Sequence, residues 1–416
     1  MKRKAAIIGG GIAGLTAAYL LNSRYDISLF EKDERVGGNA HTISTEEGLT
    51  FDIAVAVFGR RSYPNFKKLL KELGVEICYL SGNGFGWRNL DTDEAQFIVP
   101  TLRGTFATKF YALRPRIFSA LVSAMRNMRR GKRMYEQGKL DGLTMQEAYD
   151  LLPPFRENMH YLHQFVMCVV SSMYYDEVME APAPFFFGKM SKHSDFFENP
   201  LYGMFQARGN TISYVKALAS HFEDKIVLNS RIRSVARDEG GALLNMEDGS
   251  QQRFDKLVFA CNPDQALKLL EKPTAEEETL LGPWAYKDGP IVVHTDRRCF
   301  PAEYDNLFTF IYTNRDGKIH TSVNGHIRAL RRMPNDCKII SSQHPNFPID
   351  EDRIKYSRVF RTPIYTKDSV ATIRELPSLN GTANTFYCGS YFGYGLHEDA
   401  VSSAVKVAER LGVEWK

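Results

Sequence analysis

The stretch that decides the fold runs from Lys4 to Gly38 and reads KAAIIGGGIAGLTAAYLLNSRYDISLFEKDERVGG. It predicts an apolar strand over Lys4–Ile8, a helix over Ile12–Asn22 and a second strand over Ile27–Phe30. The intervening turn has glycines at 9, 11 and 14, the spacing that lets backbone approach a pyrophosphate and a helix pack closely on its strand. The positive end of the helix would face the phosphates and contribute roughly 0.3 to 1 kcal/mol per charge. The stretch therefore predicts a dinucleotide-binding unit.

The acidic residue that follows the second strand supports this interpretation. Glu31 comes 17 residues after Gly14, where its carboxylate would accept hydrogen bonds from both ribose hydroxyls of an adenosine. A carboxylate at this place disfavours a 2′-phosphate, so NADP is not expected.

A signal peptide or membrane anchor is the main alternative for the same residues. The run Ala5–Leu21 carries no charge and follows Lys2, Arg3 and Lys4. Its glycines weaken an apolar helix, however, and no small-residue cleavage site precedes polar sequence. The dinucleotide interpretation is therefore preferred.

Composition limits the function classes. A chain of 416 residues with 44% hydrophobic content predicts two or three globular domains, and a net charge of +4 gives no reason to expect nucleic acid as a partner. The six cysteines lack CxxC spacing, so neither a metal site nor a disulfide framework is predicted, and a reducing, cytoplasmic location fits best. No apolar run after the glycine turn reaches transmembrane length.

Strand and helix signals divide the chain into two interleaved parts. Residues 1–75, 205–270 and 372–416 are predicted to form a discontinuous nucleotide-binding domain, and 76–204 with 271–371 a substrate-binding domain. The segment after residue 76 has a helical and irregular pattern, with prolines as helix stops. Leu307–Thr313 and Lys318–Asn324, around an Asn-Arg-Asp-Gly turn, predict a hairpin in an antiparallel sheet. A helix is expected over Asp399–Leu411.

The motifs taken together resemble the GG-motif flavoproteins, which include amine oxidases, phytoene desaturases and protoporphyrinogen oxidases. The resemblance rests on GxGxxG at Gly9–Gly14, on Glu31, on Arg35-x-Gly37-Gly38-x-x-x-Thr42 and on Gly389 with the segment Glu398–Ser403. Within this superfamily the segment Gly393–Asp399 (GYGLHED) is similar to bacterial predicted NAD/FAD-binding proteins associated with cyclopropane-fatty-acid synthases.

This resemblance implies an α/β fold: a Rossmann-like FAD-binding domain of the amine-oxidase (GR2) type, with an interleaved α+β substrate domain that contains an antiparallel sheet. It implies extended FAD, and Gly37 with Gly38 would let backbone cross close to the cofactor a second time, which an NAD enzyme does not need. The residues expected to bind FAD are Gly9, Gly11, Ile12, Ala13, Gly14, Glu31, Lys32, Gly37, Gly38, Asn39, Thr42, Ile232, Gly389, Ser390, Glu398, Asp399 and Ala400. Asn39 stands where the superfamily usually has arginine, so one cationic contact to phosphate is expected to be missing.

Few catalytic residues are needed, because flavin itself takes the hydride. His397 and Tyr394, beside the expected flavin end of the last helix, are candidates for proton handling or substrate contact; a capping or cofactor-binding role is the alternative for His397. Asn324 is a weaker candidate, on a strand expected to face the flavin, and a surface hairpin position is its alternative.

A basic segment raises the question of membrane contact. Between residues 101 and 140 there are ten Lys or Arg and one acid, and residues 114–133 read as a basic amphipathic helix. Such a helix can lie on anionic lipid, with about 1 kcal/mol from each cation near the surface. A solvated helix packed on its own domain is the alternative.

The leading hypothesis for function is therefore FAD-dependent desaturation of a methylated or otherwise modified lipid acyl chain. A flavin-dependent fatty-acid double-bond isomerase, an amine oxidase and a non-catalytic flavin- or lipid-binding protein remain alternatives. The sequence does not determine the oligomeric state.

Overall fold

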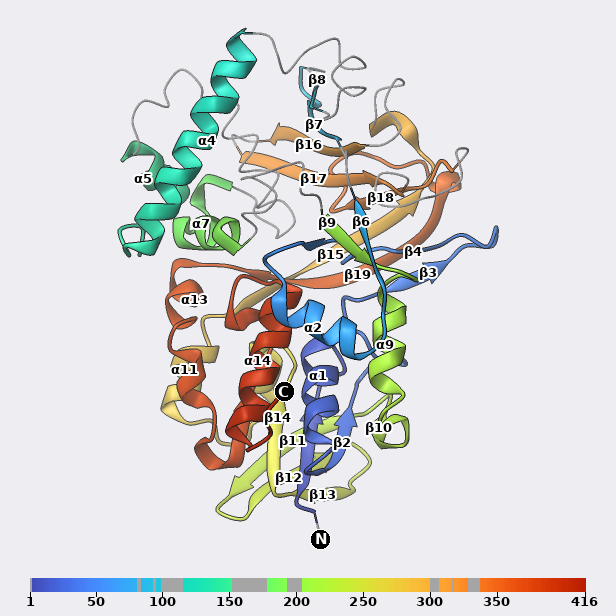
Figure 1. Ribbon diagram of the computed structural model, residues 1–416, viewed down its shortest axis with the longest axis vertical. Coiled ribbons are helices and arrows are strands. Elements are labelled where there is room, and N and C mark those ends of the chain that lie inside the picture. Colours follow the sequence, from blue (N-terminus) through green and yellow to red (C-terminus); the bar gives the residue numbers. More distant parts are fainter. Residues whose placement is uncertain are drawn as a thin grey trace.

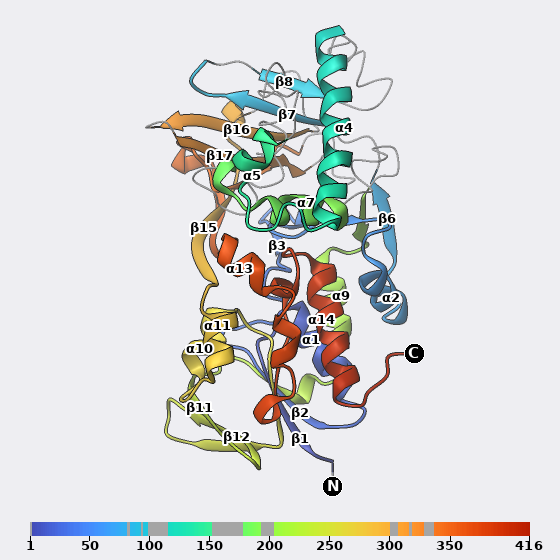
Figure 2. The same ribbon diagram turned by 90° about the vertical axis from the view of Figure 1, so that its left-hand side faces the viewer.

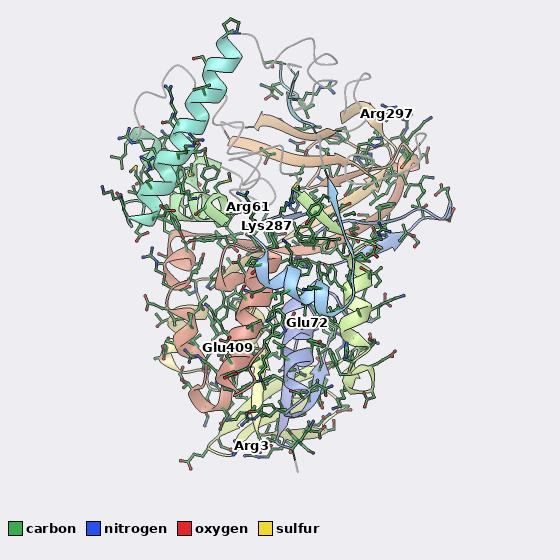
Figure 3. All side chains as sticks on the ribbon, viewed as in Figure 1. Arg3, Arg61, Glu72, Lys287, Arg297 and Glu409 are labelled. Carbon is green, nitrogen blue, oxygen red and sulfur yellow. The ribbon has the colours of Figure 1, made fainter. Side chains whose placement is uncertain are left out.

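The chain forms a parallel sheet with its helices and a larger, mainly antiparallel sheet above it (Figure 1). The computed structural model describes residues 2–80, 84–92, 95–98, 115–151, 178–192, 204–299, 307–315, 318–327 and 337–416. In Figure 3, Arg61 and Lys287 lie close to the junction of the two sheets, and Arg3 marks the opposite, amino-terminal edge of the parallel sheet.

The parallel sheet has five strands in the order β10-β2-β1-β14-β20, and each strand pairs in parallel with its neighbour. The strands are β1 (Lys4–Ile8), β2 (Asp26–Phe30), β10 (Ile226–Val227), β14 (Lys256–Phe259) and β20 (Thr385–Tyr387). Because all five run in the same direction, their carboxyl ends meet at one edge, where ligands of such sheets bind.

Alternation of apolar side chains gives this sheet two buried faces. Ala5 and Ile7 of β1 belong to one core cluster, and Ala6 and Ile8 belong to another. The first cluster packs against the helices α1 (Ile12–Leu21), α2 (Pro64–Glu72), α9 (Thr211–Ala219) and α14 (His397–Arg410). The second packs against the antiparallel strands β11 (Ile232–Asp238), β12 (Gly241–Met246) and β13 (Gln251–Phe254) and against α11 (Ala275–Leu281).

The larger sheet has seven strands in the order β19-β15-β18-β17-β16-β7-β8, antiparallel except for the parallel pair β16 and β7. Its strands are β7 (Gly84–Asn89), β8 (Ala95–Ile98), β15 (Ala285–His294), β16 (Leu307–Arg315), β17 (Lys318–His326), β18 (Ile340–Gln343) and β19 (Ile354–Ile364). The hairpin prediction is confirmed by the pairing of β16 with β17.

Two small sheets join these parts: β3 (Thr42–Ser44) with β4 (Thr50–Asp52), and β5 (Phe58–Gly59), β9 (Met204–Ala207) and β6 (Ile77–Leu80). The expectation of a helical, irregular segment after residue 76 is wrong for β6, β7 and β8. Gly84 and Gly86 lower the strand propensity of β7, but tertiary pairing to β16 and β8 makes it a strand.

The remaining helices are labelled in Figure 2, which shows the left-hand side of Figure 1 from the front. They are α4 (Pro115–Glu136), α5 (Met145–Asp150), α7 (Ala183–Lys192), α10 (Pro263–Leu269) and α13 (Lys367–Thr372). The predicted helix over 114–133 is α4, apart from position 114, which lies outside the described residues. Gly131 of α4 packs on the ring of Phe187 of α7. Within the described ranges no helix is long and apolar enough to cross a membrane.

Candidate functional site

The glycine turn after β1 has two kinds of glycine. A Cβ on Gly9, whose φ is +113°, would lie 2.7 Å from the carbonyl oxygen of Ala260, and a Cβ on Gly14 would overlap the carbonyl oxygen of Gly9. These two glycines therefore allow the strand, the turn and the helix to pack. A Cβ on Gly11 would meet nothing within 4 Å. Gly11 thus borders open space at the carboxyl edge of the sheet.

The start of α1 is open to an anion. Gly11 is its N-cap, no side chain caps the helix, and no acid lies in the first turn. The first N–H groups of a helix have no acceptor within it, so here they face the space beside Gly11 with the positive end of the helix dipole. A phosphate group would accept hydrogen bonds from these N–H groups and would be attracted by the positive end of the dipole.

Glu31 lies directly after β2 with its carboxylate held from two sides. Its Oε2 accepts a 2.6 Å hydrogen bond from the N–H of Gly10, and its Oε1 accepts one of 3.0 Å from the N–H of Asp33. A carboxylate has about four acceptor positions, so two remain for ribose hydroxyls. Ser230, whose N–H binds the carbonyl of Glu31, has a buried hydroxyl with no partner in the structure. The predicted contact Lys32 is exposed, and Ile232 begins β11 close by.

The second glycine loop lies on the first. The N–H of Gly37 donates to the carbonyl of Gly10 at 2.7 Å, and Gly37 pairs with Gly11 in an isolated bridge. Gly38 has a φ of +56°, and a Cβ there would lie 3.3 Å from the Cα of Gly11. Asn39 is exposed. The two loops therefore converge beside the opening at Gly11.

The residues present fit FAD at this edge. The opening at Gly11 has the place and polarity that a pyrophosphate requires, and Glu31 has acceptor capacity for a ribose. Three buried polar atoms along the same edge lack partners in the structure: Nε of Arg35, Nδ1 of His41 and Oγ of Ser230. Buried polar atoms are normally paired, so a bound polar ligand would account for them.

The third predicted contact segment is a loop and the first turn of α14. The Ser403 hydroxyl lies 3.0 Å from the N–H of Gly389 and accepts its hydrogen bond. Oδ2 of Asp399 accepts from the N–H groups of Tyr394, at 2.8 Å, and Leu396, at 3.1 Å. The side chain of Asp399 therefore orders the loop that precedes the helix. The helix begins at His397, two residues before the predicted start.

Two predicted cofactor contacts have their side chains engaged elsewhere. Both carboxylate oxygens of Glu398 accept backbone N–H groups at the start of α2, from Asn65 at 3.0 Å and Phe66 at 2.9 Å. The Thr42 hydroxyl donates to Asp52 and accepts from the N–H of Ile212 at the start of α9. These side chains therefore fix helices α2 and α9, and contact of Thr42 and Glu398 with FAD stays a prediction.

His397 lies in the aromatic core and not in an open site. Its Nε2 is 2.9 Å from the hydroxyl of Tyr214, and its ring packs on Phe58 and Phe66 with centroid distances of 5.3 and 5.4 Å. Burial lowers the pKa of His397 to about 3, so the imidazole is neutral at pH 7. This geometry favours the alternative of a structural role over proton transfer.

Tyr394 and Asn324 differ in their relation to the candidate site. The phenol of Tyr394 is hydrogen-bonded to Tyr135 and packs against Gly188 of α7. Asn324 is fully buried and hydrogen-bonded to Ser342 of β18. The neighbouring Ser341 donates a hydrogen bond to the carbonyl of Ile53, whose N–H binds His41 after the second glycine loop (Gly37 and Gly38, the GG loop). Because side chains alternate along a strand, Ser342 and its partner Asn324 point to the opposite face of the sheet. A catalytic role for Asn324 stays a prediction.

Sequence reasoning missed Lys189, a buried cation on α7. Lys189 is 7% exposed, lies 5.7 Å from the ring of Phe185 and interacts electrostatically with Asp399. Burial lowers the pKa of Lys189 to about 8. Its signal in the sequence is a single charge within an apolar stretch, Ala183–Met190, which a surface helix would also allow.

No group of three or more His, Cys, Asp or Glu that could hold a metal ion occurs within the described residues.

A parallel nucleotide-binding sheet, two glycine loops over one helix start and a second sheet above them define a flavoprotein oxidoreductase. Residues 12–317 match the family described as flavin-containing amine oxidoreductase. The chain belongs to this family, and its cofactor is FAD.

The similar proteins include a desaturase, an oxidase and an isomerase. The chain is 46% identical over 57 residues to 1-hydroxycarotenoid 3,4-desaturase of Flavobacterium sp. (strain P99-3), a match that covers 14% of this chain and 12% of that protein. Its fold is similar to that of putrescine oxidase, with a TM-score of 0.72, 12% identity and 99% of each chain covered. It is also similar to that of a CLA-producing fatty acid isomerase from P. acnes, with a TM-score of 0.69, 15% identity and 98% of each chain covered.

Proposed function

We propose that this protein is an FAD-dependent oxidoreductase that desaturates a lipid acyl chain, with a methylated or otherwise modified fatty acid as the substrate class. When bound, FAD accepts a hydride from a substrate carbon. The chain's own residues would bind FAD at the two glycine loops and Glu31, exclude water and orient the acyl chain. The fatty acid isomerase among the structural neighbours and the carotenoid desaturase among the relatives support a substrate without an amine.

The observation that carries the proposal is the aromatic and basic surrounding of Tyr394. Phe185 stacks on Tyr365 with a centroid distance of 4.0 Å and lies 6.2 Å from the ring of Tyr394. These aromatic rings would offer an acyl chain an apolar surface to pack against. Lys189 lies on the same helix, and at pH 7 it is mostly protonated. Protonated Lys189 would repel the ammonium of an amine substrate and attract a lipid carboxylate, and Asp399 offsets part of its charge. Tyr394 is accordingly the proposed substrate contact.

A fatty-acid double-bond isomerase is the second candidate, supported by the similar fold of the isomerase from P. acnes. An amine oxidase is the third, supported by the fold of putrescine oxidase, and the position of Lys189 argues against it. A non-catalytic flavin- or lipid-binding protein belongs to another class and would bind FAD without turnover.

Three further expectations remain part of the proposal. The division into a cofactor domain (1–75, 205–270, 372–416) and a substrate domain (76–204, 271–371) is one, and the association with cyclopropane-fatty-acid synthases is another. The third is contact of α4 with anionic membrane from the cytoplasmic side, for which the exposed side chains of Arg126, Arg129, Arg130 and Arg133 provide the charge.

Anaerobic turnover tests the proposal. The FAD-loaded protein is mixed with methyl-branched and unsaturated acyl lipids, or with putrescine, and flavin absorbance and lipid products are followed. Lasting flavin bleaching with a new double bond supports desaturation, whereas product formation with oxidised flavin identifies an isomerase. Hydrogen peroxide released in air from putrescine alone identifies an amine oxidase, and no reaction with any substrate favours the non-catalytic alternative. Lipid analysis of cells with and without the protein then narrows the substrate.

A further inference from the structure

Two buried nitrogen atoms without partners lie together beside the GG loop. The guanidinium of Arg35 donates to the carbonyl of Gly38 at 2.7 Å and to the carbonyls of Val36 and Ala40 through its two terminal nitrogens, which leaves Nε buried and unpaired. His41 is 8% exposed, and its Nδ1 is also buried and unpaired. Arg35 and His41 interact electrostatically.

A second arginine reaches this place from the antiparallel sheet. Tyr356, Arg358 and Phe360 alternate along β19 and therefore point to the same face. The rings of Tyr356 and Phe360 pack edge-on against His41, with centroid distances of 6.0 and 6.1 Å. Arg358 lies between them and is 3.3 Å from Oδ2 of the half-exposed Asp33.

The two arginines repel each other, and their charges together with burial keep His41 neutral at pH 7. Burial and then Arg358 lower the pKa of Arg35, with Asp33 and Glu31 among the acids that act against this. Burial and then the two arginines lower the pKa of His41 to about 4. Glu31 is already held by two backbone N–H groups. Arg358 already has Asp33 as its partner, whereas Nε of Arg35 has none, so an anion beside this nitrogen would satisfy it.

We propose that Arg35, His41 and Arg358 form a cradle for the pyrophosphate of FAD, in which Arg358 of β19 supplies the positive charge that Asn39 does not. Gly38 joins this cradle to the opening at Gly11, so the phosphates lie between the start of α1 and β19. The cofactor then holds the antiparallel sheet against the GG loop. This inference rests on FAD as the cofactor and is independent of the substrate.

Binding measurements on the apoprotein test the cradle. Arg358→Gln is expected to weaken FAD binding about 10- to 100-fold, as for the loss of a charged hydrogen bond, and to flatten its dependence on salt. His41→Phe keeps the ring contacts, removes Nδ1 and should weaken FAD binding by a smaller factor. Arg361→Gln, on the same strand but paired with Asp264 at 2.8 Å, is the matched control and should leave FAD binding unchanged.

Riboflavin separates a phosphate contact from a ring contact, because it has the isoalloxazine and no phosphate. The cradle predicts that Arg358→Gln leaves riboflavin affinity unchanged and weakens competition by inorganic pyrophosphate. Urea unfolding of each apoprotein establishes that the variants are folded. Unchanged FAD affinity in folded Arg358→Gln, or an equal loss for riboflavin and FAD, would overturn the proposal. Neither outcome depends on which substrate is oxidised.

Discussion

The substitution Gly11→Ala tests the affinity of the protein for FAD separately from the stability of its fold. Gly11 has φ −71° and ψ 179°, which alanine adopts without strain, and the new Cβ would meet no protein atom within 4 Å. Alanine is a poorer N-cap than glycine but lowers the entropy of the unfolded chain, so the two effects nearly offset and apoprotein stability should change by less than about 1 kcal/mol. The methyl group would occupy the space assigned to the pyrophosphate. Overpacking of about 1 to 3 kcal/mol corresponds to FAD binding weakened about 5- to 150-fold.

The assay combines urea unfolding of the apoprotein with titration of FAD followed by flavin fluorescence. Gly14→Ala is the matched control, because its Cβ would overlap the carbonyl of Gly9 and force α1 from β1. That variant should lose about 3 kcal/mol of stability or more. If Gly11→Ala binds FAD as tightly as the unchanged protein, the pyrophosphate does not lie beside Gly11 and the site is misplaced.

Three further predictions concern the cofactor, the core and the buried lysine. Glu31→Ala should weaken FAD binding by roughly 1.5 to 3 kcal/mol through lost charged hydrogen bonds, whereas an affinity unchanged in titration would remove Glu31 from the site. Glu277→Ala breaks a buried pair in which Arg237 donates two hydrogen bonds of 2.5 and 2.7 Å, and should cost about 3 to 5 kcal/mol in urea unfolding; replacing both partners by apolar residues should restore much of this, and a loss below about 1 kcal/mol would contradict the argument. The unfolded chain keeps the Lys189 proton up to about pH 10.5 and the folded chain releases it near pH 8, so stability should rise by about 3 kcal/mol between these values. Lys189→Met should abolish this rise and be the more stable protein at pH 7, and an unchanged slope would assign the titration to another group.

The sequence by itself determined the cofactor half of the protein. The glycine spacing, the apolar strands and Glu31 act locally, because each is required by a turn, a strand or a helix start within about 35 residues. The strand Lys4–Ile8 is confirmed at both of its bounds, and the family membership agrees with the resemblance.

Only the tertiary structure decided what the individual side chains do. Glu398 and Thr42 stand within or beside the expected cofactor motifs, yet their oxygens are engaged by α2 and α9, which are distant in sequence. Lys189 is buried because Tyr394 and Asp399 come to α7 from the other end of the chain, and Arg358 reaches the GG loop from β19. Burial and pairing are properties of these long-range contacts. Residue types and their spacing therefore fixed the class of cofactor, whereas the partners that set charge and orientation depended on packing between segments more than 150 residues apart.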